Sequence, residues 1–183
     1  IVGNGNTEDL TEYYIHGEPE PIVSKITEDK SLRTHILSVI VINPGIKKEE
    51  LLEFFLQTLG GLQSSKATLS FAINISLRFL SSQQLIIKKG DRYAGTAFGK
   101  KTSMLYIDPL TATYFRDAID NVSDQRKHTF GFLHLMINCE EFFPKFSLRN
   151  KDYESTSLMI ENHSSELIEP ISEYDCSRSL LAL

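Results

Sequence analysis

The residues with the clearest capacity for chemistry in this chain are basic side chains gathered in its middle third. Residues 62–107 contain one acidic and seven basic residues, a net charge of +6. The seven are Lys66, Arg78, Lys88, Lys89, Arg92, Lys100 and Lys101. Lysine and arginine bind phosphate through charge and hydrogen bonds, so the segment is suited to hold a polyanion. A basic face that docks on an acidic protein neighbour is the alternative, and the residues alone favour neither.

The acidic remainder of the chain makes this segment unusual. Residues 1–61 carry a net charge of −5 and residues 108–183 carry −6, so the whole chain of 183 residues stands at −5. A local excess of one sign produces a field that the total charge conceals. We therefore expect one basic face on an otherwise acidic protein.

Motifs for nucleotide binding are imperfect. Gly3-Asn4-Gly5 lacks the third glycine of a dinucleotide-binding loop and predicts an ordinary turn. Residues 95–102, GTAFGKKT, resemble a phosphate-binding loop loosely, because the glycines are one residue too close and Lys101 stands where a hydroxyl residue should be. No acidic pair follows an expected strand as in a Mg²⁺-binding segment. We expect neither ATP nor Mg²⁺ to bind this chain.

Candidate nucleophiles, general bases and metal ligands are scattered. The five histidines form no metal-spaced pair on one expected helix, so no metal site is predicted. His134 and Cys139 lie five residues apart and fall on different helix faces, which disfavours a nucleophile–base pair. Glu140 and Glu141 point to different sides, and we expect both to contact solvent. Nothing in the sequence supports an active site.

Composition and hydropathy indicate a folded protein outside the membrane. The apolar fraction of 41% and the aromatic fraction of 10% are those of a folding sequence. No run of about 18 apolar residues occurs, and the N-terminus has no signal-peptide pattern. The sequence predicts a cytoplasmic protein with no membrane partner. Because the first residue is not methionine, we interpret the chain as a fragment or a processed protein.

Helices and one hairpin are expected to position the basic side chains. A helix should begin at Thr27-Glu28 and stop at residues 43–45, and a second should run from Lys47 to Leu59 and end at Gly60-Gly61. Residues 85–94 predict a hairpin with its turn at residues 89–91, and Thr96 should cap a helix that continues to Tyr106.

Residues 65–83 give a conflicting signal. Apolar residues alternate with polar ones from Leu69 to Phe79, which is the period of a half-buried strand. The length and the polar flanks favour a helix instead. With a helix in this place, three helices and a two-stranded wing form the parts of a winged-helix domain.

The flanking segments predict further short elements. Ile1-Val2 reads as a strand end, and Thr7 should cap a helix over residues 8–14. Residues 17–21, GEPEP, predict an extended linker. Further helices are expected over residues 109–121, 130–139 and 151–163.

Several runs of residues resemble archaeal Ski-like superfamily 2 DNA helicases, in the order of that family. Residues 14–26, YIHGEPEPIVSKI, and 32–38, LRTHILS, are similar to the passage from the second motor domain into the winged-helix domain. The match continues through residues 49–55, 77–80, 90–93, 96–100 and 105–110. Residues 131–136 and 152–154 resemble the start of the helical ratchet domain. The resemblance covers nearly the whole chain and includes no catalytic signature.

The resemblance implies a parent protein that is an ATP-dependent 3′–5′ DNA helicase of replication-fork repair. Its motifs for ATP and Mg²⁺ would lie upstream of Ile1, so this chain is expected to be inactive alone. The upstream motor domains would be partners in cis. Forked or single-stranded DNA would be bound without sequence preference.

The resemblance also implies domain boundaries and resolves the conflicting segment. Residues 1–22 correspond to the tail of the second motor domain and a linker, 23–106 to the winged-helix domain, and 107–183 to a truncated start of the ratchet domain. Residues 73–85 are helical in that family. The fold class is therefore expected to be mainly α, with a winged helix followed by part of an all-helical bundle.

Three functions remain open. In the first, the winged helix bridges motor and ratchet domains and contacts DNA phosphates through Lys88, Lys89 and Arg92 of the wing. The remaining cations, Lys66, Arg78, Lys100 and Lys101, would add sequence-independent contacts. The second is a purely structural module without DNA contact. The third is a free-standing winged-helix regulator of transcription.

Overall fold

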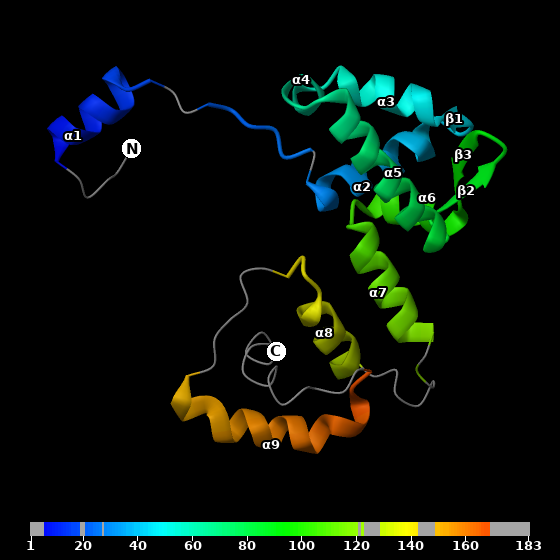
Figure 1. Cartoon of the computed structure of the whole chain (residues 1–183). Helices are drawn as coiled ribbons and strands as arrows, with labels where there is room; N and C mark the ends of the chain where they lie inside the picture. Colours follow the sequence, from blue (N-terminus) through cyan, green and yellow to red (C-terminus); the bar gives the residue numbers. More distant parts are fainter. Residues whose placement is uncertain are drawn as a thin grey trace.

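Helices make up most of the protein. The computed structural model describes residues 6–18, 21–26, 28–120, 122, 129–142 and 149–168. Helices α2 to α6 and a small sheet form one group, α7 leads away from it, α8 lies beside α7, and α9 lies below α8 (Figure 1). Helix α1 stands apart from this group, at the end of an extended segment.

The first described helix carries no buried residue. Helix α1 (Thr7–Thr11) continues into a π-helix, η1 (Glu12–His16). Its N-cap is Asn6, whose side chain accepts a hydrogen bond from the backbone N–H of Glu8, so the predicted cap at Thr7 is wrong by one residue. Thr7 instead has the helical conformation.

The group around the sheet holds the main hydrophobic core. Its elements are α2 (Asp29–Ile42), β1 (Ile46–Lys47), α3 (Lys48–Leu56), α4 (Leu59–Gln63), α5 (Lys66–Ser82), β2 (Ile86–Lys89), β3 (Arg92–Gly95) and α6 (Ala97–Leu105). Helices α2 and α5 supply most of this core, and the other members are Leu51 and Phe55 of α3, Leu85, Ile86 of β2 and Tyr93 of β3. The predicted mainly-α, winged-helix-like fold class is confirmed.

Helix α5 confirms the helical alternative for the alternating segment. Leu69, Ile73, Leu77 and Leu80 are buried at spacings of three and four residues, which form one face of a helix. Ser65 caps the helix by accepting a hydrogen bond from the backbone N–H of Thr68. The apolar residues between them, such as Phe71 and Ile75, are exposed, so the alternation reflects surface residues and not a strand.

The sheet has a third strand that the sequence did not predict. Its order is β1-β3-β2, and both pairs are antiparallel. The hairpin turn lies at Gly90-Asp91, where Gly90 has a positive φ of 61°. Strand β1 has only two residues, Ile46 and Lys47, too few for any periodicity to appear.

The predicted end, at Gly60-Gly61, of the helix that begins near Lys47 is wrong. Helix α3 ends at Leu56, and both glycines are buried inside the short helix α4, which Thr58 caps. A Cβ at Gly60 would clash with Ile26, so glycine is required here for close packing rather than for a helix end.

The second part of the protein consists of helices. They are α7 (Pro109–Asp120), α8 (Thr129–Asn138), the 3₁₀ turns η3 (Asn150–Asp152) and η4 (Ser164–Glu166), and α9 (Tyr153–His163). Pro109 occupies the first position of α7 as predicted. No helix among the described residues is long and apolar enough to cross a membrane. The expected strand end at Ile1-Val2 and the turn at Gly3-Asn4-Gly5 lie outside those residues.

Candidate nucleic-acid interface

A row of three cations crosses the sheet at the tip of the wing. Lys47 of β1 is paired with Arg92 of β3, and Arg92 is paired with Lys89 of β2. Directly opposite residues of antiparallel strands project from the same face, with Cβ atoms about 5 Å apart. The register therefore brings Lys47, Arg92 and Lys89 together, and we call them the wing row.

Two members of the wing row are held by contacts with neighbouring residues. The Nζ of Lys47 lies 2.7 Å from a carboxylate oxygen of Asp91, and Nη1 of Arg92 donates to the carbonyl oxygen of Gly45 at 2.8 Å. The hydrogen bond from Lys47 lowers the pKa of Asp91 below its ordinary value. Asp91 thus offsets one positive charge at the tip, and the row as a whole stays cationic.

Lys88 belongs to the wing but not to the wing row. It is paired with Tyr93, one position along the strands, and so projects from the opposite face of the sheet. Its Nζ lies 5.6 Å from the centre of the Tyr93 ring, a cation–π contact that fixes the side chain. Lys88 and Lys89 therefore lie on opposite faces of the sheet.

The other predicted cations are exposed but are not brought into one cluster. Lys66 begins α5 and Arg78 follows twelve residues later, about 18 Å along the helix axis. Lys100 and Lys101 lie on α6. These four form no ion pair with another described residue. Whether they bind phosphate remains a prediction.

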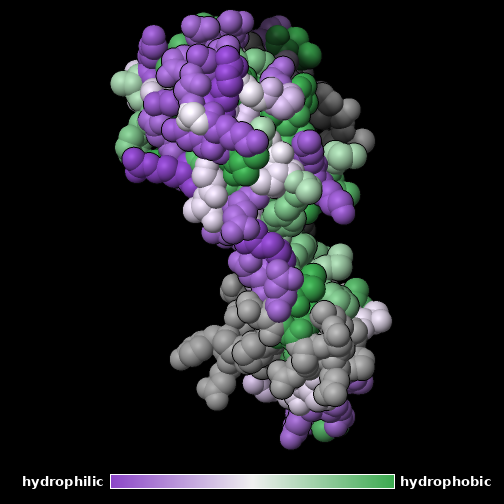
Figure 2. All heavy atoms as spheres, turned by 90° about the vertical axis from the view of Figure 1, so that its right-hand side faces the viewer, coloured by the Kyte–Doolittle hydropathy of each residue, from purple (hydrophilic) through white to green (hydrophobic). Residues whose placement is uncertain are grey.

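The side of the molecule that carries the wing has a mainly hydrophilic upper surface. Figure 2 shows this side, with hydrophilic residues predominating over the winged-helix-like group and hydrophobic ones gathering lower down. A hydrophilic face that carries exposed cations is suited to a solvated polyanion.

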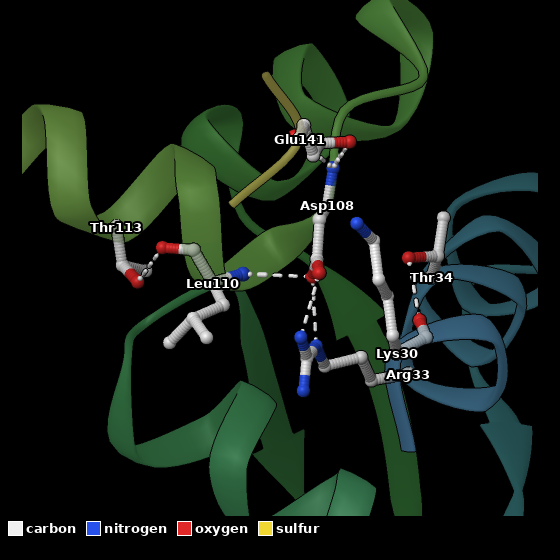
Figure 3. A network of polar contacts seen from close by, with 7 residues as sticks. All are labelled: Lys30, Arg33, Thr34, Asp108, Leu110, Thr113 and Glu141. Carbon is white, nitrogen blue, oxygen red and sulfur yellow. Dashed lines mark hydrogen bonds and ion pairs between the residues drawn. The ribbon is translucent and has the colours of Figure 1, made fainter. Parts of the chain in front are cut away.

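An arginine paired with a buried carboxylate joins this group to the helices that follow. Nε and Nη2 of Arg33, on α2, donate to the two carboxylate oxygens of Asp108 at 2.7 and 2.6 Å (Figure 3). The side chain of Asp108 is 2% exposed and that of Arg33 is 15% exposed. The hydrogen bond to Asp108 raises the pKa of the Arg33 guanidinium above its ordinary value. The guanidinium also lies 5.7 Å from the ring centre of Phe79 on α5.

Asp108 has partners on α7 and beyond α8 as well. Its carboxylate accepts a hydrogen bond from the backbone N–H of Leu110, in the first turn of α7. Its own backbone N–H donates to the carboxylate of Glu141 at 3.2 Å. Glu140 and Glu141 are both exposed, as expected, and Glu141 makes this hydrogen bond in addition. Asp108 and Glu141 are 33 residues apart in the sequence, so no local sequence pattern predicts their contact.

A second arginine holds α7 against the winged-helix-like group. Nη1 of Arg116 donates to the backbone oxygen of Gln83 at 2.7 Å, directly after α5. The guanidinium lies 5.1 Å from the ring centre of Phe98 on α6. A cation at the C-terminal end of a helix is also favoured by the helix dipole. Arg33 and Arg116 together fix the direction in which α7 leaves the group.

The described residues contain no group of His, Cys, Asp or Glu that could hold a metal ion. His134 is buried, and its ring contacts the side chain of Asn138. Cys139 is a free thiol. The geometry defines a class of protein: a winged-helix-like module with a cationic wing, joined by partly buried arginine contacts to a helical segment.

Comparison with known proteins identifies relatives of the chain among archaeal DNA helicases. ATP-dependent DNA helicase Hel308 of Thermococcus kodakarensis is 30% identical over 180 residues, covering 94% of this chain and 16% of the relative. Hel308 of Methanocella arvoryzae is 29% identical over 165 residues, covering 89% and 22%. Hel308 of Methanocaldococcus jannaschii is 29% identical over 177 residues, covering 92% and 14%. No protein-family model matches the chain.

The matches cover most of this chain but less than a quarter of the length of each of these relatives. Such matches fit a fragment of a Hel308-type ATP-dependent DNA helicase. The resemblance to archaeal superfamily 2 helicases that the residues indicated is confirmed. The predicted domain boundaries at residues 22 and 106 remain predictions.

Proposed function

We propose that this chain is a non-catalytic part of an ATP-dependent 3′–5′ DNA helicase that acts in replication-fork repair. Its winged-helix-like group bridges the upstream motor domains to the helical segment and contacts DNA phosphates through the wing. ATP and Mg²⁺ would be bound elsewhere in the whole protein, and this chain would not hydrolyse ATP alone.

The wing row is the observation that best supports contact between the chain and DNA. Like charges placed opposite each other destabilise a pair of strands, and Lys47, Arg92 and Lys89 are placed in this way. A phosphate bound between them would relieve the repulsion and release counterions. Phosphate contacts of this kind carry no sequence information, so we expect binding to forked or single-stranded DNA without sequence preference.

The partly buried arginine contacts support the bridging role. Arg33 and Arg116 attach α7 at separate points of the winged-helix-like group, so a displacement of one part is passed to the other. The same contacts favour the second candidate function, a purely structural module that does not touch DNA. The two candidates make opposite predictions for DNA binding.

A salt titration separates these candidates. The affinity of the chain for forked, duplex and single-stranded DNA, each in two unrelated sequences, would be measured by fluorescence anisotropy. The proposal predicts equal affinity for both sequences and a logarithmic slope of about 0.9 per phosphate neutralised on duplex DNA. Absence of binding at low salt would favour the structural module. A strong preference for one sequence would favour a transcription regulator.

A further inference from the structure

The outward face of helix α6 combines two lysines with exposed apolar residues. Lys100 and Met104 are four residues apart, as are Lys101 and Leu105, so all four lie within one sector of about 140° around the helix. Met104 is 82% exposed and Leu105 is 70% exposed. The buried residues of α6, on its opposite side, are Gly99 and Thr102. The sector therefore faces solvent.

An exposed tyrosine follows this sector directly. Tyr106 caps α6 in the left-handed region, with φ 57° and ψ 32°, and its backbone N–H donates to the carbonyl oxygen of Ser103. Glycine or asparagine usually occupies such a position, because the region is strained for a bulky residue. Tyr106 is nevertheless 70% exposed. Backbone strain of this kind is concentrated at functional sites.

The two lysines and the tyrosine have no partner within the part of the chain that the structure describes. Lys100, Lys101 and Tyr106 form no ion pair, side-chain hydrogen bond or ring contact with another described residue. No acidic residue stands between Arg92 and Ile107 in the sequence. We use the name α6 surface for the set Lys100, Lys101, Met104, Leu105 and Tyr106. It offers two free positive charges, an aromatic ring and two apolar side chains.

The α6 surface begins at the base of the wing, where α6 leaves the sheet directly after β3 (Figure 1). Cγ of Lys100 lies 3.5 Å from the place that a Cβ of Gly95 would take. Gly95 is two residues from Tyr93, so the stem of Lys100 lies on the face of the sheet that also carries Lys88. About two residues of strand, roughly 7 Å, separate the two lysines along β3. The α6 surface thus continues the face of the wing that lies opposite the wing row.

This composition fits single-stranded DNA better than duplex DNA or a protein. Proteins that bind single strands combine cations along the backbone with aromatic side chains on which unpaired bases stack. In duplex DNA the bases present only their edges in the grooves, so an exposed ring finds no base face to cover. A protein partner would have to supply acids opposite both lysines beside an apolar patch. A single strand supplies a charge on every nucleotide and apolar base faces together.

We propose that the α6 surface binds a single strand of DNA, with Lys100 and Lys101 on phosphates and Tyr106 stacked on a base. Met104 and Leu105 cover the sugar and the base beside it. This inference rests on the proposed function and deepens it, because it assigns the unpaired strand to α6 and leaves duplex phosphates to the wing row. The two sites lie on opposite faces of the wing, and a fork presents a duplex and an unpaired strand at once.

The test measures binding of two labelled oligomers to the 183-residue chain by fluorescence anisotropy at low salt. One is a short oligothymidylate, and the other has the same sugar-phosphate backbone without bases. Tyr106→Leu should weaken binding of the oligothymidylate about fivefold or more and leave binding of the abasic oligomer unchanged, because the ring contacts a base and not a phosphate. Tyr106→Phe keeps the ring and should retain both affinities.

Neutralisation of the two lysines should have the complementary effect. Lys100→Gln/Lys101→Gln should weaken binding of both oligomers, with a logarithmic salt slope that falls by about 0.7 for each phosphate that is no longer neutralised. The matched control is Lys25→Gln/Lys30→Gln, which removes the same charge at exposed lysines outside the basic segment. It should leave both affinities and both slopes unchanged.

Four results would overturn the proposal. They are no binding of the oligothymidylate, unchanged binding of it in Tyr106→Leu, an equal loss for the abasic oligomer in that variant, and an equal loss in the lysine control. A change in elution volume of the chain with Tyr106→Leu, without a change in oligothymidylate binding, would assign the α6 surface to a protein contact.

Duplex binding of the same variants, and of a variant with the wing row reversed in charge, separates this inference from the proposed function. If reversal of the wing row leaves duplex binding unchanged while Tyr106→Leu weakens binding of the oligothymidylate, the proposed wing contact fails and the inference stands. If reversal weakens duplex binding while Tyr106→Leu has no effect on the oligothymidylate, the inference fails and the proposed function stands.

Discussion

Asp91 opposes the function proposed for the wing. It is the one acid within residues 62–107, and it lies at the tip of the hairpin bound to Lys47. A phosphate that approaches the wing row meets its negative charge, and Lys47 must exchange one anionic partner for another. We infer that Asp91 stabilises the free wing and limits its affinity for DNA.

Replacement of Asp91 should therefore strengthen DNA binding. In Asp91→Asn the wing loses a negative charge and Lys47 is released, so we expect affinity for forked DNA to rise about three- to tenfold, with a steeper dependence on salt. Asp120→Asn changes the same charge at the exposed end of α7 and serves as the control. Equal gains in both variants would indicate a general charge effect and contradict the assignment.

The pH dependence of the Lys47–Asp91 pair follows from the lowered pKa of Asp91. A carboxylate whose pKa is lowered on folding stabilises the fold above its unfolded pKa, and this contribution is lost as the pH falls through the folded pKa. The difference in DNA affinity between the chain and Asp91→Asn should persist at neutral pH and shrink in acid. A titration of binding against pH would measure it.

Asp108 should be among the residues on which stability depends most. Its removal leaves Arg33 with a partly buried, unpaired charge and removes a hydrogen-bond acceptor from the first turn of α7. We expect Asp108→Ala to lower the free energy of unfolding by about 3 kcal/mol in urea titration. The double variant Arg33→Met/Asp108→Leu should recover part of the loss. A loss below about 1 kcal/mol would show that the pair does not join the two parts.

At the scale of elements, the sequence predicted those with strong local signals. The hairpin was found because glycine and aspartate stand in its turn, and α6 because Thr96 caps it by accepting from the N–H of Gly99. Helix α5 gave the period of a strand, since Phe71 and Ile75 are apolar yet exposed. Length and family resemblance identified it as a helix.

Elements that depend on distant contacts could not be predicted. Strand β1 exists because its two residues pair with β3. Lys47, for example, pairs with Arg92, which lies 45 positions further along the sequence. Because β1 was not predicted, Lys47 was absent from the predicted cations. Helix α4 tolerates Gly60 inside it because Ile26 packs there, which no local pattern reveals.

The segment before α2 is attached to α4 by one side chain. The amide of Gln63 accepts a hydrogen bond from the N–H of Ser24 and donates one to the carbonyl oxygen of Ile22, both at 2.8 Å. This two-point contact resembles the pairing of a neighbouring strand. It fixes the direction from which the chain enters the winged-helix-like group.

Removal of the Gln63 side chain should change the rate of hydrogen exchange at one amide, that of Ser24. In Gln63→Ala we expect hydrogen exchange at Ser24 to accelerate by about tenfold or more, since its N–H loses its acceptor. The amide of Leu69, which donates to the oxygen of Ser65 within the first turn of α5, should exchange as before. Unchanged exchange at Ser24 in native-state NMR would show that Gln63 does not hold the linker.

At the scale of the whole molecule, charge and rigidity are arranged together. The basic segment is displayed by the wing, α5 and α6, while the parts before and after it are acidic. Arg33 and Arg116 attach α7 to the same group, so the wing is held in a defined direction relative to the helical segment. A phosphate bound at the wing would therefore orient the helical segment on DNA as well.

The charge reversal of the wing row tests this account most directly. Affinity for forked DNA would be measured across a range of salt for the chain, for Lys47→Glu/Lys89→Glu/Arg92→Glu, and for a control with the same charge change at exposed lysines outside the segment. The control is Lys25→Glu/Lys30→Glu/Lys151→Glu.

We predict that the wing-row variant binds forked DNA about tenfold or more weakly at low salt, with a logarithmic salt slope that falls by about 0.9 for each duplex phosphate that the wing no longer neutralises. The control should keep the original slope. An unchanged slope in the wing-row variant, or an equal change in both, would show that the wing does not bind DNA.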